Sequence, residues 1–458
     1  SDSSFKKKSD AIDALAQHND PRVLSIFKAL LAGNLYVRKA DSAIVFGTVR
    51  EDNVAIEDAL TGQSAGTLPK VDLTLVGINN IMRKKLKAVI SRLSLSATDA
   101  PARRAAVEEM MKGLDAETIA VLRDALPNER DPATRALLST AVAMEDINQS
   151  DKSTRLAAIA VLAESTRSEA RRRLSALVDP GPGAGEGEQD ADIRNAASLA
   201  LASIDRRLAL YSAVETTFFG LSLGSVLLLA AIGLAITFGV MGVINMAHGE
   251  LIMLGAYTTY VVQMLMPNHI DASLFVAIPA AFLVSALVGM AIERGVIRFL
   301  YGRPLETLLA TFGVSLVLQQ AVRSIFSPLN RQVDTPSWMS GSLEINSALS
   351  LTYNRIYVMV FALLVFFALL MLLKKTVFGL QMRAVMQNRP MARAMGIRSG
   401  WVDALTFGLG SGIAGIAGVA LSQLTNVGPN LGQAYIVDSF MVVVFGGVGN
   451  LWGTFVGA

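Results

Sequence analysis

The distribution of apolar residues divides the chain into two parts. A helix needs roughly 20 apolar residues to cross the hydrocarbon core of a bilayer, which is about 30 Å thick. Seven runs of suitable length follow residue 215, at about 218–240, 247–266, 273–293, 305–326, 355–373, 401–424 and 434–458. Charged residues interrupt the apolar positions throughout the first 214 residues. The pattern predicts a soluble part, residues 1–210, followed by a polytopic α-helical membrane part, residues 211–458.

The soluble part has a β-like beginning and a helical remainder. Short β-type runs and turns between about 34 and 76 predict a small sheet, and helical periodicity starts at about residue 79. Three stretches that begin at Asp131, Asp151 and Asp190 share an acidic start, a following Arg, and Ala or Leu at spacings of three to four. Stacked helical hairpins of a HEAT-like solenoid show this pattern, and ordinary Ala-rich helices with N-caps are the alternative. The Gly- and Pro-rich stretch 179–188 predicts a flexible linker.

The charges support this division and exclude several functions. Of 41 basic and 38 acidic residues, 12 and 9 fall within 215–458. The chain has no Cys and three scattered His, which argues against disulfides, thiolate chemistry and a metal centre. A net charge of +3 is too small for a nucleic-acid partner. A Gly-x-x-x-x-Gly-Lys-Ser/Thr phosphate loop does not occur in the sequence, so we expect neither an enzymatic function nor a cofactor in this chain.

The orientation follows from the basic residues, because short loops rich in Lys and Arg stay in the cytosol. Two loops hold nine of the 12 basic residues of the membrane part, namely Arg294, Arg298 and Arg303, and Lys374, Lys375, Arg383, Arg389, Arg393 and Arg398. We therefore expect 327–354 to be an ordered external loop with an interfacial aromatic residue, Trp338. Counting back along the segments places the soluble part outside the cytosol. The last apolar run ends without a polar tail, so we expect the membrane part to be incomplete at residue 458.

Polar residues inside the apolar runs are the first candidate site. Asn245, His248 and Glu250 lie in a length that is otherwise apolar, and Gln319 and Gln320 lie in the fourth run. Such groups must face protein or water within a membrane. Gly249 predicts a helix break that brings His248 and Glu250 together, or a turn between the first two segments. These residues line or gate a pathway, or they form interhelical hydrogen bonds that fix a broken helix.

A short helix in the second basic loop is the next candidate. Pro390 suits a first helical turn and Gly396 a C-terminal stop. Met391, Ala394 and Met395 would form an apolar face, with Arg389 and Arg393 on a basic face. A helix this short needs a packing partner, so we expect it to enter a groove of another subunit. An ordinary positive-inside loop is the alternative.

A Gly-dense run at 408–418 is the third feature. Gly408 with Gly412, and Ser411 with Gly415, form small-xxx-small pairs that permit close helix contact. This run predicts helix packing rather than a site.

These stretches together resemble permeases of the branched-chain amino acid ABC importer family. The resemblance rests on 245–250, 254–257, 309–316, 387–392 and 443–449, and it extends over about 215–458. It implies a bacterial inner-membrane permease. Together with the two candidate sites above, we expect the pathway or gate to include Asn245, His248, Glu250, Thr311 and Gln319. We expect ATPase coupling to involve Gln387, Asn388, Arg389, Pro390, Met391, Arg393, Met395 and Gly396.

The resemblance also implies a set of partners and a cargo. The partners would be a second homologous permease subunit, two cytosolic ATPase subunits, a periplasmic substrate-binding protein and membrane lipid. The long soluble domain, with the stretches 336–341 and 351–355, is similar to the urea importer's permease, so we expect urea to be moved inward by alternating access. A branched-chain amino acid permease and a passive channel for urea or another small solute are the alternatives. The expected fold is all-α, with a HEAT-like, mostly helical periplasmic domain that carries the small sheet.

Overall fold

The computed structural model describes residues 2–16, 20–50, 53–179, 188–346 and 348–458. The predicted linker 179–188 lies outside this range except for its two end residues. Within the described residues the chain forms two compact units, Ser1–Leu208 and Ala209–Ala458. The division falls within α9 (Ala191–Met241), whose C-terminal part is the first predicted membrane segment.

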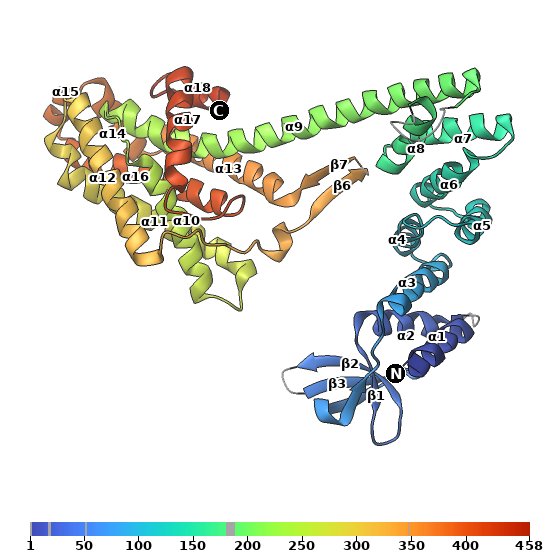
Figure 1. The fold of residues 1–458 in the computed structure, drawn as a ribbon. Coiled ribbons are helices and arrows are strands. Elements are labelled where there is room, and N and C mark those ends of the chain that lie inside the picture. The colour runs from blue at the N-terminus through green and yellow to red at the C-terminus, as the bar shows by residue number, and fades with distance from the viewer. Residues whose placement is uncertain (1, 17–19, 51–52, 180–187, 347) are drawn as a thin grey trace. The chain divides into compact units, whose positions relative to one another are not determined.

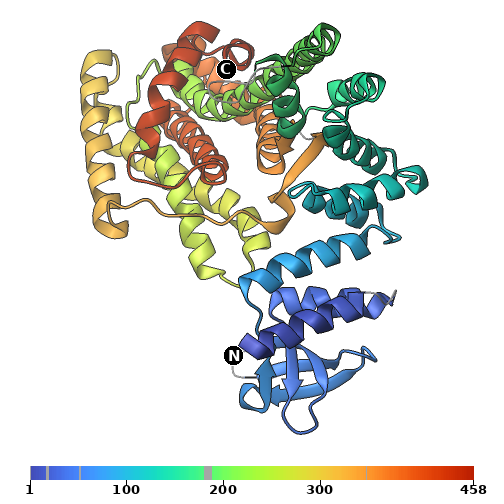
Figure 2. The same ribbon diagram turned by 45° about the vertical axis from the view of Figure 1, so that its right-hand side comes forward.

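The small sheet predicted in the N-terminal unit is confirmed. Five antiparallel strands lie in the order β4-β3-β2-β1-β5, and their bounds are β1 Leu35–Arg38, β2 Ile44–Arg50, β3 Asn53–Asp58, β4 Ser64–Pro69 and β5 Leu73–Leu75. Helices α1 (Asp2–Ala16), α2 (Pro21–Ala32) and α3 (Asn80–Ser94) share a buried apolar cluster with the start of β1. Figure 2 shows these helices above the sheet.

An array of short helices completes the N-terminal unit (Figure 1). After α3 come α4 (Ala100–Met110), α5 (Ala116–Ala125), α6 (Pro132–Asp146), α7 (Lys152–Glu164) and α8 (Ser168–Val178). The carboxylates of Asp131 and Asp151 cap α6 and α7 by accepting hydrogen bonds from backbone N–H groups. The Arg four residues after each cap donates to a backbone carbonyl of the preceding loop, Arg135 to Glu129 and Arg155 to Ile147. The repeated start therefore has a structural cause, and the HEAT-like arrangement stays a prediction.

Helices dominate the second unit. Their bounds are α10 His248–Leu265, α11 Ile270–Gly295, α12 Pro304–Phe326, α13 Tyr353–Lys375, α14 Val377–Gln387, α15 Arg389–Ala394, α16 Ser399–Ser422, α17 Leu431–Gly446 and α18 Leu451–Gly457. Among the described residues, five helices are long and apolar enough to cross a membrane: Ala191–Met241, Ile270–Phe299, Pro304–Phe326, Tyr353–Lys375 and Ser399–Ser422. The predicted single run 434–458 is wrong, because Gly447 and Gly449 adopt φ of 90° and 79° and separate α17 from α18.

Helix α16 is the centre of the membrane unit. Its most apolar window is 89% buried, compared with 28% for that of α13. The Gly-dense run makes this possible, since Cβ atoms built at positions 412 and 415 would lie 2.5 Å from the Phe282 ring and from the Ala281 carbonyl oxygen of α11. The packing role predicted for this run is confirmed.

The described residues of the loop between α12 and α13 form defined structure, while the external position predicted for this loop stays a prediction. It contains the hairpin of β6 (Ser342–Asn346) and β7 (Leu349–Thr352). Trp338 stacks on Phe275 with ring centroids 5.5 Å apart and donates its indole N–H to the Asp271 carbonyl oxygen at 3.1 Å. The Asp271 carboxylate accepts hydrogen bonds from the backbone N–H and hydroxyl of Ser337. These contacts fix the loop to the beginning of α11.

Candidate functional site

The candidate membrane site is built on a break between α9 and α10. Gly242 adopts a φ of 65° directly after α9 ends, a conformation that suits glycine. The Asn245 side-chain oxygen accepts the backbone N–H of Ala247 at 3.0 Å and shapes the turn into α10. The predicted turn between the first two segments is therefore present. The break lies at 242–247 and not at Gly249, which is inside α10 and packs closely against Gly432.

Glu250 is the centre of a buried polar cluster. One of its carboxylate oxygens, Oε1, accepts hydrogen bonds from the Ser315 hydroxyl at 2.9 Å and from Gln319 Nε2 at 2.7 Å. All three residues are less than 5% exposed. The other oxygen, Oε2, has no hydrogen-bond partner among the described residues. A buried carboxylate oxygen without a partner is costly within a membrane unit.

Helix α12 faces this cluster with a polar stripe. Thr307, Thr311, Ser315 and Gln319 are spaced four residues apart, so they lie on one helix face, and each is buried. The opposite positions hold exposed apolar residues such as Leu309 and Val317. This inverted amphipathic pattern suits a helix with lipid on one side and a polar interior on the other. Ser315 was not among the predicted site residues, although the four-residue spacing marks it. Gln320 lies on the exposed side.

The remaining candidates are divided between two neighbouring helices. The Thr311 hydroxyl oxygen accepts the backbone N–H of Met246 at 3.1 Å, which ties α12 to the break. His248 is fully buried, and its Nε2 lies 2.9 Å from the carbonyl oxygen of Ala230 in α9. The expected convergence of His248 and Glu250 is wrong, since the two side chains contact different helices. The structure brings Glu250, Ser315 and Gln319 together and places His248 against α9.

The second candidate, α15, begins and ends where the sequence predicts a short helix. The Asn388 side chain caps it by accepting the backbone N–H of Met391 at 3.0 Å, and Gln387 is the last residue of α14. Gly396 adopts a φ of 84°, and the N–H of Ile397 donates to the Ala392 carbonyl oxygen, which closes the C-terminus. The helix has six residues, so it relies on contacts with its surroundings.

The two faces of α15 have different environments. Met391 and Met395 are 59% and 77% exposed. In contrast, the predicted basic face is used within the chain: Arg389 forms an ion pair with Asp403, and Arg393 Nε donates to the Ser399 hydroxyl at 2.7 Å. Asp403 was missed by the sequence analysis because its partner lies 14 residues away in a different element. The exposed surface at α15 therefore includes Met391 and the adjacent Met395, beside the exposed Arg393.

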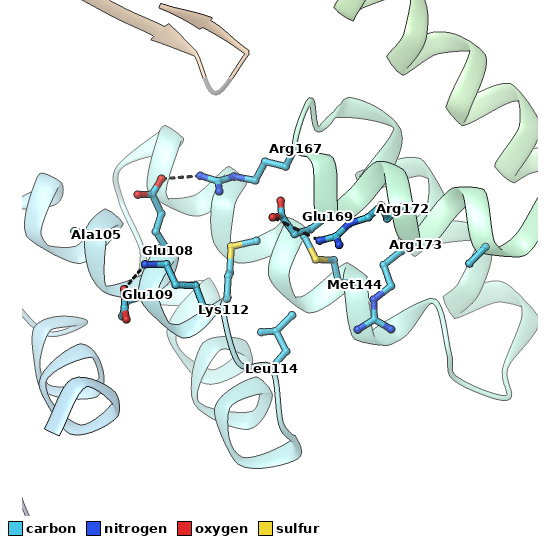
Figure 3. Close-up of a pocket in the computed structure, with 12 residues that line it drawn as sticks. Ala105, Glu108, Glu109, Lys112, Leu114, Met144, Arg167, Glu169, Arg172 and Arg173 are labelled. Carbon is cyan, nitrogen blue, oxygen red and sulfur yellow. Dashed lines mark hydrogen bonds and ion pairs between the residues drawn. The ribbon is translucent and has the colours of Figure 1, made fainter. Parts of the chain in front are cut away.

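A charged pocket of about 970 Å³ lies in the N-terminal unit (Figure 3). It is formed by α4, α6, α8 and the residues that follow α4. Arg167 pairs with Glu108 at 2.6 Å and Lys112 with Glu109 at 2.5 Å. The lining holds four basic and three acidic residues, so its charges nearly balance and the pocket does not indicate a particular ligand.

A metal centre finds no support in the residues that the structure describes, where no three His, Asp or Glu side chains gather into a metal-binding group. His18 lies outside the described residues. His248 and His269 belong to different parts of the membrane unit, at the starts of α10 and α11.

Comparison with known proteins identifies relatives of the membrane unit. The family model described as "Branched-chain amino acid transport system / permease component" matches residues 216–458. The permease protein LivH of Salmonella typhimurium, from a high-affinity branched-chain amino acid transport system, is 33% identical over 255 residues, which are 53% of this chain and 82% of LivH.

Two other relatives carry names of the same kind. The high-affinity branched-chain amino acid transport system permease protein LivH of Escherichia coli is 32% identical, over 53% of this chain and 82% of its own length. The corresponding protein BraD of Pseudomonas aeruginosa is 29% identical, over 54% of this chain and 83% of its own length. No solved structure matches the chain. The family match leaves residues 1–215 uncovered.

Proposed function

The chain belongs to the family of branched-chain amino acid transport system permease components, and from this premise we propose that α10 and α12 line its solute pathway. The observation that carries the proposal is the buried contact between Glu250 and the polar stripe of α12. In a membrane unit, such groups face a cavity or a partner helix. The unpartnered Glu250 Oε2 would accept an N–H of the passing solute.

Transport by this permease is driven by partner subunits in our proposal. The sequence has no phosphate loop, so ATP would be hydrolysed by two cytosolic ATPase subunits. The exposed Met391 of α15 and the adjacent Met395 would enter a groove on an ATPase, because flexible thioether side chains adapt well to an apolar partner surface. A second homologous permease would complete the pathway, and a binding protein would deliver the solute. The N-terminal unit would then lie on the periplasmic side.

A branched-chain amino acid is the cargo that the comparisons favour, because the relatives are named for transport of that class. Its ammonium group would pair with the Glu250 carboxylate. Urea is the second candidate. It rests on the stretches 336–341 and 351–355 and on the N-terminal unit, which the family match does not include. The comparisons give urea no support. Urea also has N–H donors for Glu250 Oε2.

Identification of the partners and the cargo tests the proposal. The full-length protein would be purified from its native membrane, and its bound subunits would be identified by mass spectrometry. Uptake of labelled leucine and labelled urea would then be compared in vesicles that contain the whole assembly. We expect two kinds of subunit, an ATPase and a second permease, and competition between leucine and other branched-chain amino acids. Urea uptake without leucine uptake would reject the amino acid and select the second candidate. Absence of an ATPase partner would reject the proposed function.

A further inference from the structure

A buried ion pair connects the short helix α15 to α16. The Arg389 guanidinium donates to both oxygens of Asp403, at 2.5 and 3.0 Å. The Asp403 side chain is 1% exposed and that of Arg389 is 27% exposed. Two-point contact fixes the orientation of the guanidinium as well as its position. Loss of either member would leave a buried charge without compensation, which is strongly unfavourable.

Tyr301 extends this connection from α15 to α11. The Arg389 guanidinium carbon lies 5.1 Å from the centre of the Tyr301 ring, within the range of a cation–π contact. The Tyr301 hydroxyl donates to Glu293 Oε1 at 2.8 Å, and Glu293 is a buried residue near the end of α11. A second cation–π contact joins α11 to α16, because the Arg294 guanidinium carbon lies 4.8 Å from the centre of the Trp401 ring.

The close packing of α16 continues this path to the candidate pathway. A Cβ at position 418 would lie 2.0 Å from the Ile252 carbonyl oxygen of α10, and one at position 255 would lie 2.0 Å from the Gly415 carbonyl oxygen. Such close contact couples the positions of the two helices, because a tightly packed interior leaves no room for one to approach the other further. Glu250 is on α10, so a displacement of α16 would reach it.

We propose that Asp403 and Tyr301 are positioning residues that fasten α15 to α16 and α11, so that a movement imposed on α15 is carried to α10 and Glu250. This inference rests on the proposed function, in which ATPase subunits move α15. It adds the residues through which the movement enters the membrane helices. The ion pair transmits force because it is bidentate and buried, whereas a solvated pair would exchange partners with water.

The ratio of ATP hydrolysed to solute transported tests the inference in the whole reconstituted assembly. We expect Asp403→Asn to raise this ratio about tenfold, a typical size for coupling between sites. Tyr301→Phe keeps the ring and loses the hydroxyl bond, so it should raise the ratio less. The control is Glu306→Gln, which removes the exposed Arg303–Glu306 ion pair at the first basic loop, close in sequence to Tyr301, and should leave the ratio unchanged. An unchanged ratio in both Asp403→Asn and Tyr301→Phe would overturn the inference.

The distance between α15 and α16 shows whether a variant loosens the contact between these helices or only destabilises the protein. This chain has no Cys, so labels on Ala394→Cys and Leu405→Cys, both at exposed positions on α15 and α16, would be the only spin labels that it carries. We expect one narrow distance distribution with and without ATP, and a broad one when Asp403→Asn is added. A distribution that stays narrow in that variant would also overturn the inference. If Asp403→Asn does not assemble, the ATP-to-solute ratio and the distance distribution are both measured on Tyr301→Phe, in which the Arg389–Asp403 ion pair is intact. Failure of the parent assembly to hydrolyse ATP would reject the proposed function, while the distances would still test the connection.

Discussion

The crossing of α10 and α16 gives a prediction whose size follows from the structure. Gly418→Ala adds a Cβ that would lie 2.0 Å from the Ile252 carbonyl oxygen and 2.7 Å from the Ala256 nitrogen. Ordinary contact begins at 3.4 Å, so the helices must separate by about 1.4 Å, the difference between 3.4 and 2.0 Å. Backbone atoms cannot rotate away as a flexible side chain would. The whole crossing must therefore open.

The opening has an energetic cost that exceeds the benefit of alanine. A gap of 0.5–1 Å already removes roughly a quarter to a half of the dispersion energy between facing atoms. Overpacked interiors lose about 1–3 kcal/mol, whereas alanine gains up to about 1 kcal/mol over glycine within a helix. The net effect for Gly418→Ala is a loss of stability, and a larger residue such as valine should lose more.

Thermal unfolding of the purified protein in detergent, followed by circular dichroism, measures this effect. A loss of 1 kcal/mol lowers Tm by roughly 2–4 °C in a unit of this size. The control is Gly313→Ala on α12, where an added Cβ meets nothing within 4 Å. We expect the control to unfold at or above the parent temperature and Gly418→Ala to unfold below it. Equal temperatures for the two variants would refute the argument from close packing.

Three further predictions follow from other parts of the chain. Glu250→Gln should lower uptake at least about tenfold, because it removes the charge that accepts the solute, while Glu306→Gln should not. Met391→Asp should abolish ATP-driven uptake and leave the protein in the membrane, whereas Met391→Leu should retain uptake. Arg103, bonded to Glu129 at 2.8 Å, lowers the pKa of that carboxyl to about 2. The free energy of unfolding that this low pKa contributes is complete above about pH 4.5 and is lost as the pH falls toward 2. In Glu129→Gln, the unfolding free energy measured as a function of pH should therefore fall less steeply in this range.

Most of the membrane architecture could be predicted from the sequence, because hydropathy and length determine where a helix can cross a bilayer. Six of the seven apolar runs correspond to helices α9–α13 and α16. The last run failed for a local reason. Gly447 and Gly449 adopt positive φ angles. The sequence alone does not show which glycines of an apolar run take such a conformation. The break before α10 was misplaced for the same reason, since Gly242 rather than Gly249 takes the positive φ.

The site was predicted less completely than the fold. The ends of α15 depend on neighbours in sequence, so Pro390 and Gly396 marked them, although the cap by Asn388 was not predicted. In contrast, the partners of Glu250 lie 65 and 69 residues away, and packing alone determines which polar residues meet. The same limit explains why Asp403 was missed. Helices α1 and α2 were also not predicted, and they pack on the sheet through residues such as Ile12 and Phe27.

Solute accumulation in proteoliposomes tests the central claim, that this permease moves its cargo through a gated pathway driven by partner ATPases. The full-length protein would be reconstituted with its co-purified subunits and binding protein, with ATP enclosed on the ATPase side. We expect labelled solute to accumulate above its external concentration only when ATP and all subunits are present. Rapid downhill flux through the permease alone, unaffected by ATP, would contradict the claim and identify a passive channel.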